Sequence, residues 1–472
     1  MFKSSAKDYP YRHDPLPQYQ KVAIFGLGRS GLAAARLLSR FGKTILASDT
    51  APESKRCDLE ARLPPGTQLI LERNAIEDAE VIVTSPGLEP SLPIFEEARS
   101  RGIPILAELE LGYLASGAPL VAISGTDGKT TTTTLTSHIL IKCSIRNLIG
   151  GNIGTPLCAW LDEDSPRTAD IACHVVETSA FQLVFCPTFK PRLFIATNIA
   201  EDHVEYFNND WKAYEQAKRS PLSRMTQDDV AILNASDACI RKWHWDTDAQ
   251  CAWYASCRAD IPETAKNYAW YEDGMIHIHY GGHKHRMLTN LPNLRGMHNI
   301  MNIMASVLAA LFSGCDWSDI VQAVGSYTLP PHRIQKVCVK EGVTFIDDSK
   351  ATNPHAAIAG LQTVDEPLVL IAGGVDKGLV LTEWIKCMKK NVRGLVLIGE
   401  LTERLDREAS ACGLKCPILH CATLEEAVPC SHGLATGLGA SVVLLSPACS
   451  SYDMFKDYRH RGEVFSVAAR KL

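Results

Sequence analysis

The stretch LVAISGTDGKTTTTTLTSHILI, residues 120–141, predicts how the chain folds. An apolar run over 120–123 is short enough for a buried strand. A glycine-bounded turn over 125–128 follows, and Lys129 and Thr130 then open a segment with apolar residues at helical spacing. Glycine allows the backbone N–H groups to turn toward phosphate oxygens, and the helix N-terminus adds positive potential. The stretch therefore predicts a phosphate-binding loop.

The two residues after this loop carry its predicted chemistry. Lys129 can reach the outer phosphates of a nucleotide, and the Thr130 hydroxyl can bind Mg²⁺. The generic pattern places four residues between its glycines, whereas Gly125 and Gly128 are separated by two. An ordinary strand-to-helix turn is the alternative, but a Gly-Lys-Thr sequence directly after an apolar strand favours phosphate binding.

The composition is that of a globular protein with several domains. The chain has 472 residues, which suggests about three domains. With 46% hydrophobic residues, 21% charged residues and a net charge of −5, we expect no nucleic-acid-binding surface. No apolar run reaches the roughly 18 residues of a membrane span, so we expect no membrane insertion. The 16 cysteines show no C-x-x-C spacing and are predicted to be free thiols.

Residues 1–20 are polar, with prolines at 10, 15 and 17 and no apolar signal core. We expect them to be a loose extension of a cytoplasmic protein.

A second glycine-rich loop lies near the N-terminus. An apolar strand is predicted over 21–25, the loop spans 26–31 (GLGRSG), and a helix is predicted over 32–41. The next strand, over 44–47, ends beside Asp49. This is the dinucleotide-binding fingerprint with its acidic residue. It leaves two alternatives open: an NAD-dependent dehydrogenase, or a Rossmann-like unit that binds no dinucleotide.

The alternation of strands and helices continues to about residue 115. A strand over 81–84 ends in Ser85-Pro86-Gly87, a turn that could contact the same ligand. The sequence Ser-Gly-Ala-Pro over 116–119 is a plausible domain boundary.

Two further strands of the central region end on possible metal ligands. The apolar stretch over 171–177 ends on Glu177, and the strand over 193–197 precedes His203. A carboxylate at the end of a strand beside a phosphate-binding loop is well placed for Mg²⁺. A helix-capping acid and a structural histidine are the alternatives. The glycine-rich segment over 150–154 is predicted to be a loop.

The histidine-rich stretch over 275–286 suggests a metal site at first sight. Gly281-Gly282 predicts a hairpin turn instead, and the stretch from 254 to 291 reads as antiparallel. With period-two alternation, His277 and His279 share one face with Lys284 and Arg286, whereas His283 and His285 share the other. The four histidines therefore cannot converge on one ion.

A helix opening near residue 297 carries two amide side chains on one face. Asn299 and Asn302 are three residues apart near its N-terminus. Side chains in this position could hydrogen-bond a base or a ribose.

The last region predicts a second nucleotide-type fold without a phosphate loop of its own. Strands over 343–346, 368–372, 395–398 and 442–445 each exit into a polar, Gly- or Ser-rich turn, as in a doubly wound sheet. We therefore expect an α/β protein with a Rossmann-like N-terminal domain, a central phosphate-loop domain with a parallel sheet plus a small antiparallel sheet, and a Rossmann-like C-terminal domain. The predicted boundaries are 1–20, 21–118, 119–329 and 330–472.

Short motifs recur in order along the chain: GTDGKT (125–130), GGNIG (150–154), ETSAFQL (177–183), TNIAEDH (197–203), MHNIMN (297–302), HR (332–333), DDSKATN (347–353), GGVDK (373–377) and SPACSSYDMFK (446–456). Together these motifs resemble those of the Mur ligases, the ATP-dependent amide-bond-forming enzymes of peptidoglycan synthesis. The resemblance spans the chain from about Lys21 to its end, and the last three motifs favour the D-glutamate-adding branch. The family also uses a shortened phosphate loop.

The resemblance implies a reaction. ATP would phosphorylate the carboxylate of UDP-N-acetylmuramoyl-L-alanine, and the amine of D-glutamate would displace phosphate from the acyl phosphate. A carboxylate is a poor acyl donor, so phosphorylation supplies its leaving group, and the protein aligns and neutralises the anions. The resemblance also implies a cytoplasmic monomer that acts in cell-wall biogenesis.

The resemblance assigns catalytic roles to Lys129, Glu177, His203 and Lys218, and metal-binding roles to Thr130, Glu177, His203 and Lys218. Thr130 and Glu177 would hold one Mg²⁺, and His203 would bind a second. Lys218 matches the family's carbamylated lysine. A neutral lysine amine that adds CO₂ becomes an anion, which can hold Mg²⁺ where an ammonium would repel it.

The resemblance distributes the other site residues over three ligands. ATP would contact Gly125, Thr126, Asp127, Gly128, Lys129, Thr130, Thr131, Asn299, Asn302, Arg333 and Asp348. The UDP-sugar would contact Gly28, Ser30, Asp49, Thr50, Ser85, Gly87, Asn152, Ser179 and Gln182. D-Glutamate would contact Lys350, Thr352, Lys377, Ser451 and Tyr458. The chain departs from the family pattern at Ala51, at Asp127 and at Tyr458.

Overall fold

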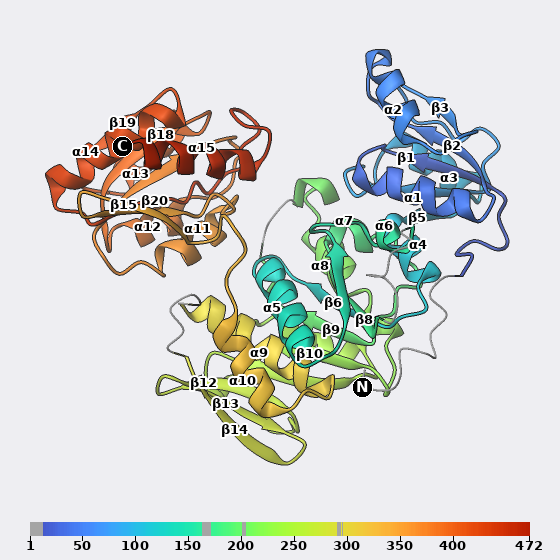
Figure 1. The fold of residues 1–472 in the computed structure, drawn as a ribbon, viewed down its shortest axis with the longest axis horizontal. Coiled ribbons are helices and arrows are strands. Elements are labelled where there is room, and N and C mark those ends of the chain that lie inside the picture. Colours follow the sequence, from blue (N-terminus) through green and yellow to red (C-terminus); the bar gives the residue numbers. More distant parts are fainter. Residues whose placement is uncertain (1–12, 163–170, 201–203, 290–293, 295) are drawn as a thin grey trace. The chain divides into compact units, whose positions relative to one another are not determined.

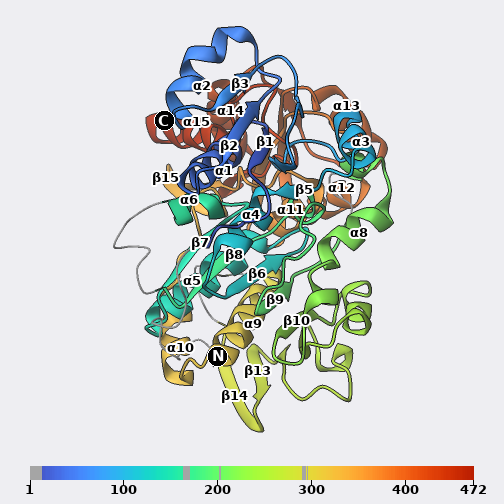
Figure 2. The same cartoon turned by 90° about the vertical axis from the view of Figure 1, so that its right-hand side faces the viewer.

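The computed structural model describes residues 13–162, 171–200, 204–289, 294 and 296–472 (Figures 1 and 2). The chain forms three β-sheets flanked by helices, so the predicted α/β class is confirmed. The first two sheets lie in one compact unit, and the third lies in a second unit that includes residues 296–298 and 328–472. The compact unit that holds the first two sheets ends at Tyr327.

The first sheet is a five-stranded parallel sheet in the order β3-β2-β1-β4-β5. Its central strand β1 has four consecutive buried residues, as expected for a strand covered on both faces. Helix α1 begins at Arg29, earlier than predicted, because Gly28 takes the N-cap position. The elements are β1 (Lys21–Phe25), α1 (Arg29–Arg40), β2 (Thr44–Ser48), α2 (Arg56–Arg62), β3 (Gln68–Ile70), β4 (Val81–Thr84), α3 (Pro93–Ser100), β5 (Ile105–Ala107) and α4 (Glu108–Ala115).

The second sheet has nine strands in the order β14-β13-β12-β11-β10-β9-β6-β8-β7. Its strands are β6 (Leu120–Ser124), β7 (Asn147–Gly151), β8 (Cys173–Glu177), β9 (Leu193–Ala196), β10 (Val230–Asn234), β11 (Gln250–Ala255), β12 (Tyr268–Glu272), β13 (Met275–Tyr280) and β14 (His283–Leu288). Its helices are α5 (Lys129–Lys142), α6 (Leu157–Asp162), α7 (Ala180–Leu183), α8 (Trp211–Arg219), α9 (Met297–Phe312) and α10 (Trp317–Ser326).

The predicted antiparallel stretch begins later than expected. Strand β11 runs parallel to β12, and antiparallel pairing starts between β12 and β13. The connection over 256–267 is long enough for the crossover that parallel strands need, whereas β12, β13 and β14 are joined by tight turns. The antiparallel strands therefore extend the parallel sheet rather than forming a separate small one.

The predicted arrangement of the histidine hairpin is confirmed. His277 pairs with Arg286 and His279 with Lys284, whereas Ile278 pairs with His285 and Tyr280 with His283. The two histidine pairs thus lie on opposite faces. In the part of the chain that the structure describes, no group of three or more His, Cys, Asp or Glu residues could hold a metal ion.

The first and second sheets share one apolar core. Phe95 lies 5.9 Å from Phe25 of the first sheet and 5.1 Å from Phe185 of the central region, measured between ring centroids. The backbone N–H of Ala107 also donates to the carbonyl of Phe185 over 2.7 Å. This shared core explains why the first two predicted domains form one compact unit.

The third sheet has six strands in the order β15-β16-β20-β17-β18-β19, with β15 antiparallel at one edge. One apolar cluster packs α11, α12 and α13 on one face, and a second packs α14 and α15 on the other. This is the predicted doubly wound arrangement (Figure 1). The elements are β15 (Gln335–Lys340), β16 (Val343–Asp347), α11 (Pro354–Leu361), β17 (Leu368–Gly373), α12 (Thr382–Met388), β18 (Val392–Ile398), α13 (Thr402–Ala411), β19 (Ile418–His420), α14 (Leu424–Leu438), β20 (Val442–Leu445) and α15 (Tyr458–Lys471).

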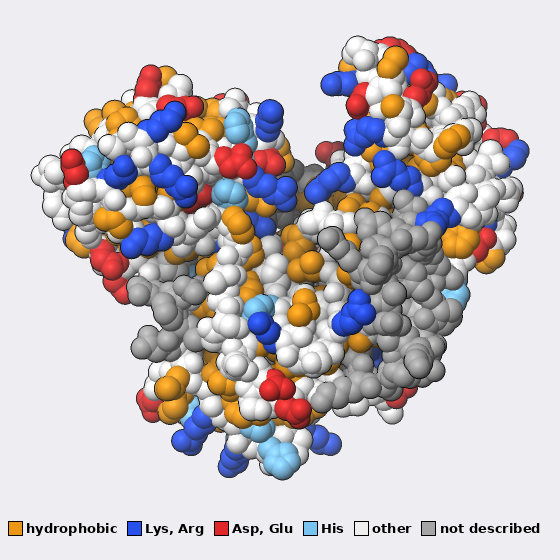
Figure 3. Space-filling model, in the orientation of Figure 1, with side chains coloured by type: hydrophobic (Ala, Val, Ile, Leu, Met, Phe, Trp, Pro, Cys, Tyr) orange, Lys and Arg blue, Asp and Glu red, His pale blue; other side chains and the backbone are white. Residues whose placement is uncertain are grey.

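The distribution of charge on the surface and the state of the cysteines agree with what the composition predicts. Cationic, anionic and apolar side chains are interspersed on the face drawn in Figure 3. All 16 cysteines are free thiols, as predicted. Among the described residues, no helix is both long and apolar enough to cross a membrane.

Candidate active site

The loop between β6 and α5 requires glycine at both of its ends. Gly125 has φ 143° and Gly128 has φ 78°, which are backbone conformations that other residues rarely adopt. A Cβ at Gly125 would lie 1.9 Å from Oγ1 of Thr197, and one at Gly128 would lie 2.5 Å from Oδ1 of Asn302. Strand β9 and helix α9 therefore approach the loop too closely for any side chain there.

Residues that follow β9 hold the loop in shape. The N–H of Asp127 donates to Oδ1 of Asn198 over 2.8 Å, and the N–H of Thr126 donates to the Asn198 carbonyl over 2.8 Å. The Thr197 hydroxyl donates to the Asp127 carbonyl over 2.6 Å. The sequence interpretation gave no role to Thr197 or Asn198, although both directly follow a strand that ends beside β6.

The first turn of α5 and the loop after β7 bring two predicted residues to one buried carboxylate, that of Glu177. The Thr130 hydroxyl donates to Oε2 of Glu177 over 2.8 Å, and Nδ2 of Asn152 donates to Oε1 over 2.8 Å. Lys129 bends back over the loop and donates from Nζ to the Thr126 carbonyl over 2.5 Å. These contacts place a hydroxyl and a carboxylate side by side at the start of the helix.

The donor chemistry around Glu177 fits Mg²⁺. The residue is 2% exposed, and the described residues provide it with hydrogen bonds from Thr130 and Asn152 but with no Lys, Arg or His ion pair. A buried carboxylate without a cationic partner is costly, and Mg²⁺ prefers oxygen ligands of this kind. Thr130 and Glu177 could therefore hold the ion, and His203 lies outside the described residues.

Lys218 of α8 lies beneath the phosphate loop. The residue is 2% exposed, and its Nζ donates to the carbonyl of Gly125. The same Nζ lies 4.7 Å from the centroid of the Tyr214 ring, and the Tyr214 hydroxyl forms a 3.1 Å hydrogen bond with that of Thr126. The helix thus brings a buried amine to the loop on which the predicted nucleotide would lie.

Two residues assigned to the UDP-sugar form a helix cap next to Glu177. Ser179 accepts a hydrogen bond from the N–H of Gln182, and Gln182 Oε1 accepts from the N–H of Ser179, which is the reciprocal capping box. This cap begins α7 directly after β8. Asn152, Ser179 and Gln182 therefore surround the same strand end.

Asn302 of α9 lies against the phosphate loop. Its Oδ1 accepts a hydrogen bond from the Thr132 hydroxyl over 3.1 Å, close to Gly128. Asn299 is buried almost one turn earlier in the same helix. Arg333 and Asp348, the other two residues assigned to ATP, belong to the second compact unit.

The N-terminal glycine loop is braced by its predicted acidic residue. Oδ2 of Asp49 accepts from the N–H of Leu27 over 2.5 Å, and Oδ1 accepts from the N–H of Ala51 over 2.8 Å. The Ser85 hydroxyl donates to the carbonyl of Gly26 over 2.7 Å. Gly28 caps α1 without a side-chain hydrogen bond. Because glycine has no side chain, the N-cap residue does not satisfy the N–H groups in the first turn of α1, and such a helix end suits an anion.

The remaining residues of this group lie around the same helix end. Gly28, Thr50 and Gly87 are exposed, and Ser30 lies in the first turn of α1. Arg29 connects this end to the glycine-rich 150–154 segment, because its Nη1 donates to the Gly154 carbonyl over 2.8 Å. The start of α1 and the glycine-rich 150–154 segment are thus in direct contact.

Two loops at the strand ends of the third sheet are joined by a buried arginine. Nη2 of Arg461 donates to the carbonyl of Ser349 over 2.8 Å and to that of Cys449 over 2.9 Å. Arg461 is fully buried, and burial lowers its pKa to about 10. The loop after β16 carries Lys350, and the loop after β20 carries Ser451. The sequence interpretation missed Arg461, because an arginine in an amphipathic helix reads as a surface residue.

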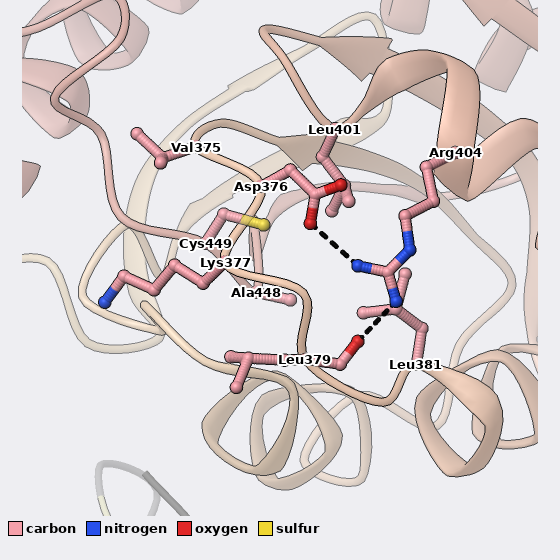
Figure 4. A pocket seen from close by; sticks show the side chains of 9 residues that line it. All are labelled: Val375, Asp376, Lys377, Leu379, Leu381, Leu401, Arg404, Ala448 and Cys449. Carbon is pink, nitrogen blue, oxygen red and sulfur yellow. Dashed lines mark hydrogen bonds and ion pairs between the residues drawn. The ribbon is translucent and has the colours of Figure 1, made fainter. Parts of the chain in front are cut away.

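Other residues assigned to D-glutamate lie in the same loops. Nζ of Lys350 lies 5.3 Å from the centroid of the Tyr458 ring. Ser451 is buried, whereas Thr352 is partly exposed just before α11. Lys377 belongs to the loop after β17 and lines a small pocket (Figure 4).

Asp348, which the sequence interpretation assigned to ATP, is a buried acid in the same loop as Lys350. Burial raises its pKa to about 7, while the hydrogen bond from the Ser446 hydroxyl and the charge of Arg333 act in the opposite direction. The Ser446 hydroxyl donates to its Oδ2 over 2.8 Å. The neighbouring Asp347 lies 2.7 Å from Nδ1 of His332.

These features define an α/β protein of the phosphate-loop nucleotide-binding class with two further Rossmann-like sheets. Three family models match the chain: "Mur ligase MurD-like, N-terminal domain" over 20–107, "Mur ligase middle domain" over 123–310, and "Mur ligase, glutamate ligase domain" over 332–449. The chain belongs to the Mur ligase family. This membership replaces the dehydrogenase interpretation of the N-terminal glycine loop.

Curated relatives match nearly the whole chain. The chain is 35% identical over 463 residues to the UDP-N-acetylmuramoylalanine--D-glutamate ligase of Geotalea daltonii, covering 96% of this chain and 98% of that protein. It is 35% identical over 457 residues to the protein of the same name from Geobacter metallireducens, with coverage of 96% and 98%.

Solved structures share the fold at lower identity. MurF from Acinetobacter baumannii superimposes with a TM-score of 0.61 at 18% identity, covering 96% of this chain and 94% of that one. A pseudomurein peptide ligase type C from Methanothermus fervidus gives a TM-score of 0.59 at 16% identity, with coverage of 95% and 99%.

Proposed function

We propose that this protein is an ATP-dependent ligase that joins D-glutamate to UDP-N-acetylmuramoyl-L-alanine in peptidoglycan synthesis. The names of relatives that are 35% identical over nearly the whole chain support the choice of substrates. One structural observation carries the chemistry: Thr130 and the buried Glu177 meet at the start of the helix that follows the phosphate loop. We further propose that the enzyme acts as a monomer in the cytoplasm.

The reaction has two steps in this proposal. A carboxylate oxygen of the L-alanyl group attacks the γ-phosphorus of ATP, the bond to the β–γ bridging oxygen breaks, and ADP leaves. The amine of D-glutamate, after losing a proton, then attacks the acyl carbon, and phosphate leaves with the electrons of the broken C–O bond. The nitrogen gives up a second proton as the amide forms, and the departing phosphate takes it up as HPO₄²⁻. Bound Mg²⁺ would neutralise phosphate charge. Thr130 and Glu177 would hold that ion, and Lys129 would bind the outer phosphates.

The proposal divides the ligands among three regions. Residues 21–118 would bind the UDP group, 119–329 would bind ATP, and 330–472 would bind D-glutamate. The uncapped start of α1 suits a diphosphate. The cations Lys350 and Lys377 suit the two carboxylates of the amino acid.

Lys218 is proposed to carry a carbamate that contributes to a second Mg²⁺ site together with His203. Only a neutral amine adds CO₂, and burial favours the neutral form of an amine. The burial of Lys218 beneath Gly125 is consistent with this role. Incubation with ¹³C-bicarbonate should give a carbamate signal in the NMR spectrum of the wild type, and Lys218→Ala should lose it. Lys212→Ala, an exposed residue of the same helix, is the control.

Phosphate release in the presence of ATP and UDP-N-acetylmuramoyl-L-alanine tests the proposed function. We expect turnover with D-glutamate and much less with L-glutamate or L-lysine. Lys129→Ala should abolish phosphate release and leave UDP-sugar binding measurable, whereas Lys142→Ala, exposed at the far end of α5, should behave as the wild type. Equal turnover with all three amino acids would contradict the proposed acceptor, and near-normal turnover of Lys129→Ala would contradict the role of the loop.

A further inference from the structure

The loop that leaves β17 folds into a tight turn around one carboxylate. Oδ1 of Asp376 accepts a hydrogen bond from the N–H of Gly378 over 2.9 Å, and Gly378 has φ 67°. Lys377 stands between these two residues at the apex of the turn. Figure 4 shows the Lys377 side chain extending away from Arg404, whereas the Asp376 carboxylate points toward it. The direction of Lys377 therefore depends on how this turn is held.

Arg404 of α13 holds the turn on both sides of Lys377. Its Nη1 donates to Oδ1 of Asp376 over 2.7 Å, and its Nη2 donates to the carbonyl of Leu379 over 2.7 Å (Figure 4). Its Nε donates to Oε1 of Glu408, one turn later in the same helix, over 2.8 Å. Because the guanidinium is planar and rigid, three bonds of this kind fix its orientation.

Backbone contacts hold the start of the same loop. The N–H of Val375 donates to the carbonyl of Ser450 over 3.0 Å, and the N–H of Leu401 donates to the carbonyl of Gly374 over 2.9 Å. A Cβ at Gly374 would lie 2.4 Å from the Ser450 carbonyl oxygen, so the two loops are in direct contact. The start of the loop is thus fixed against the loop that carries Ser451, and Arg404 adds side-chain contacts at the turn itself.

We propose that Arg404 is a positioning residue that directs the Lys377 ammonium toward D-glutamate. The inference rests on the proposed function, in which Lys377 receives a carboxylate of the acceptor. A flexible lysine on a loosely held turn would sample many positions, so its contact with a small dianion would weaken. ATP and the UDP-sugar are assigned to other residues, and their binding does not depend on this turn.

Steady-state kinetics of Arg404→Gln test the proposal. We expect the KM for D-glutamate to rise about tenfold or more, while the KM values for ATP and the UDP-sugar stay within about twofold of the wild type. Arg404→Lys should be intermediate, because one ammonium cannot replace the planar three-bond arrangement. Arg407→Gln, an exposed arginine of the same helix, is the matched control and should leave all three values unchanged.

A second measurement separates this inference from the proposed function. Hydrogen–deuterium exchange of residues 374–379 should be faster in Arg404→Gln than in the wild type and unchanged in Arg407→Gln. Unchanged exchange would overturn the role of Arg404, whatever the enzyme's substrate. An unchanged KM for D-glutamate, or an equal rise of all three KM values, would overturn the positioning role in a protein that is otherwise active. A wild type without D-glutamate-dependent phosphate release would overturn the proposed function and with it the assignment of D-glutamate to Lys377.

Discussion

The hydroxyl of Thr130 donates a 2.8 Å hydrogen bond to Oε2 of Glu177, although the two residues are 47 positions apart in the chain. The sheet explains the contact. Strands β6 and β8 are parallel neighbours in which Ile123 is in register with Glu177. Their carboxyl ends therefore meet at one edge, where the phosphate loop begins.

Glu177→Gln should greatly reduce activity without unfolding the protein. Gln keeps the size of Glu and can still accept the hydrogen bond from Thr130, but it lacks the charge needed for Mg²⁺. We expect kcat to fall by about 10²-fold or more, as for the loss of other preorganised electrostatic groups. Phosphate release at increasing Mg²⁺ concentrations measures the effect. Glu272→Gln, an exposed residue of β12, is the control, and equal activity of the two variants would refute a metal role for Glu177.

Gly125→Ala should prevent nucleotide binding through a steric clash. The added Cβ would lie 1.9 Å from the Thr197 hydroxyl oxygen, so the loop or β9 would have to move. We expect nucleotide affinity to fall more than about tenfold, a loss of about 1.4 kcal/mol, measured by calorimetric titration with ATP. Gly274→Ala is the control that distinguishes backbone strain from a steric clash, because Gly274 has φ 77° but no atom lies within 4 Å of its Cβ position. That control should cost stability without weakening ATP binding.

Asp348→Asn should change the pH dependence of stability. The pKa of Asp348 is raised by burial to about 7, above its ordinary value of 3.8. Between these pH values the folded state binds more protons than the unfolded state, so the contribution of Asp348 to stability falls as pH rises. Asn cannot ionise. The free energy of unfolding of Asp348→Asn minus that of the wild type should therefore increase from about pH 4 to about pH 7, by about 1.4 kcal/mol per unit of pKa difference, and then level off. The difference in Tm between the two proteins should follow the same pH dependence.

The matched control for this pH experiment is Asp365→Asn, because the Asp365 side chain is 85% exposed in an ion pair with Lys390. Its Tm difference from the wild type should be nearly independent of pH. A Tm difference for Asp348→Asn that is flat, or that decreases with pH, would show that the carboxyl of Asp348 is ionised at no extra cost in the folded protein.

Arg461→Lys should destabilise the C-terminal unit despite keeping the charge. The guanidinium bridges the carbonyls of Ser349 and Cys449, and a buried lysine cannot reproduce that geometry. We expect a loss of about 2 kcal/mol, typical of a buried polar group left without its partner, measured by urea unfolding. Arg470→Lys, exposed in the same helix, should change stability little. Similar midpoints for the two variants would contradict the bridging role of Arg461.

The positions of the strands and loops could be predicted from the sequence more accurately than the way the strands pair into sheets. The phosphate loop, the histidine hairpin and the doubly wound third sheet could be recognised because glycine turns and apolar periodicity are local properties. The start of α1 was predicted too late, because no capping side chain marks Gly28. The antiparallel strands were expected to form their own sheet, because side-chain alternation shows which face is buried but not which strand lies alongside.

The sequence by itself determined the class of fold, the family and the residues that carry the proposed chemistry. These follow from short segments whose glycine, lysine and apolar spacing has a local physical meaning. The tertiary structure decided which of these segments meet: Thr130 with Glu177, Asn302 with the loop at Gly128, and Arg404 with the turn that carries Lys377. Such contacts depend on strand order and helix packing, because residues far apart in the chain approach only when the sheets assemble around their buried cores.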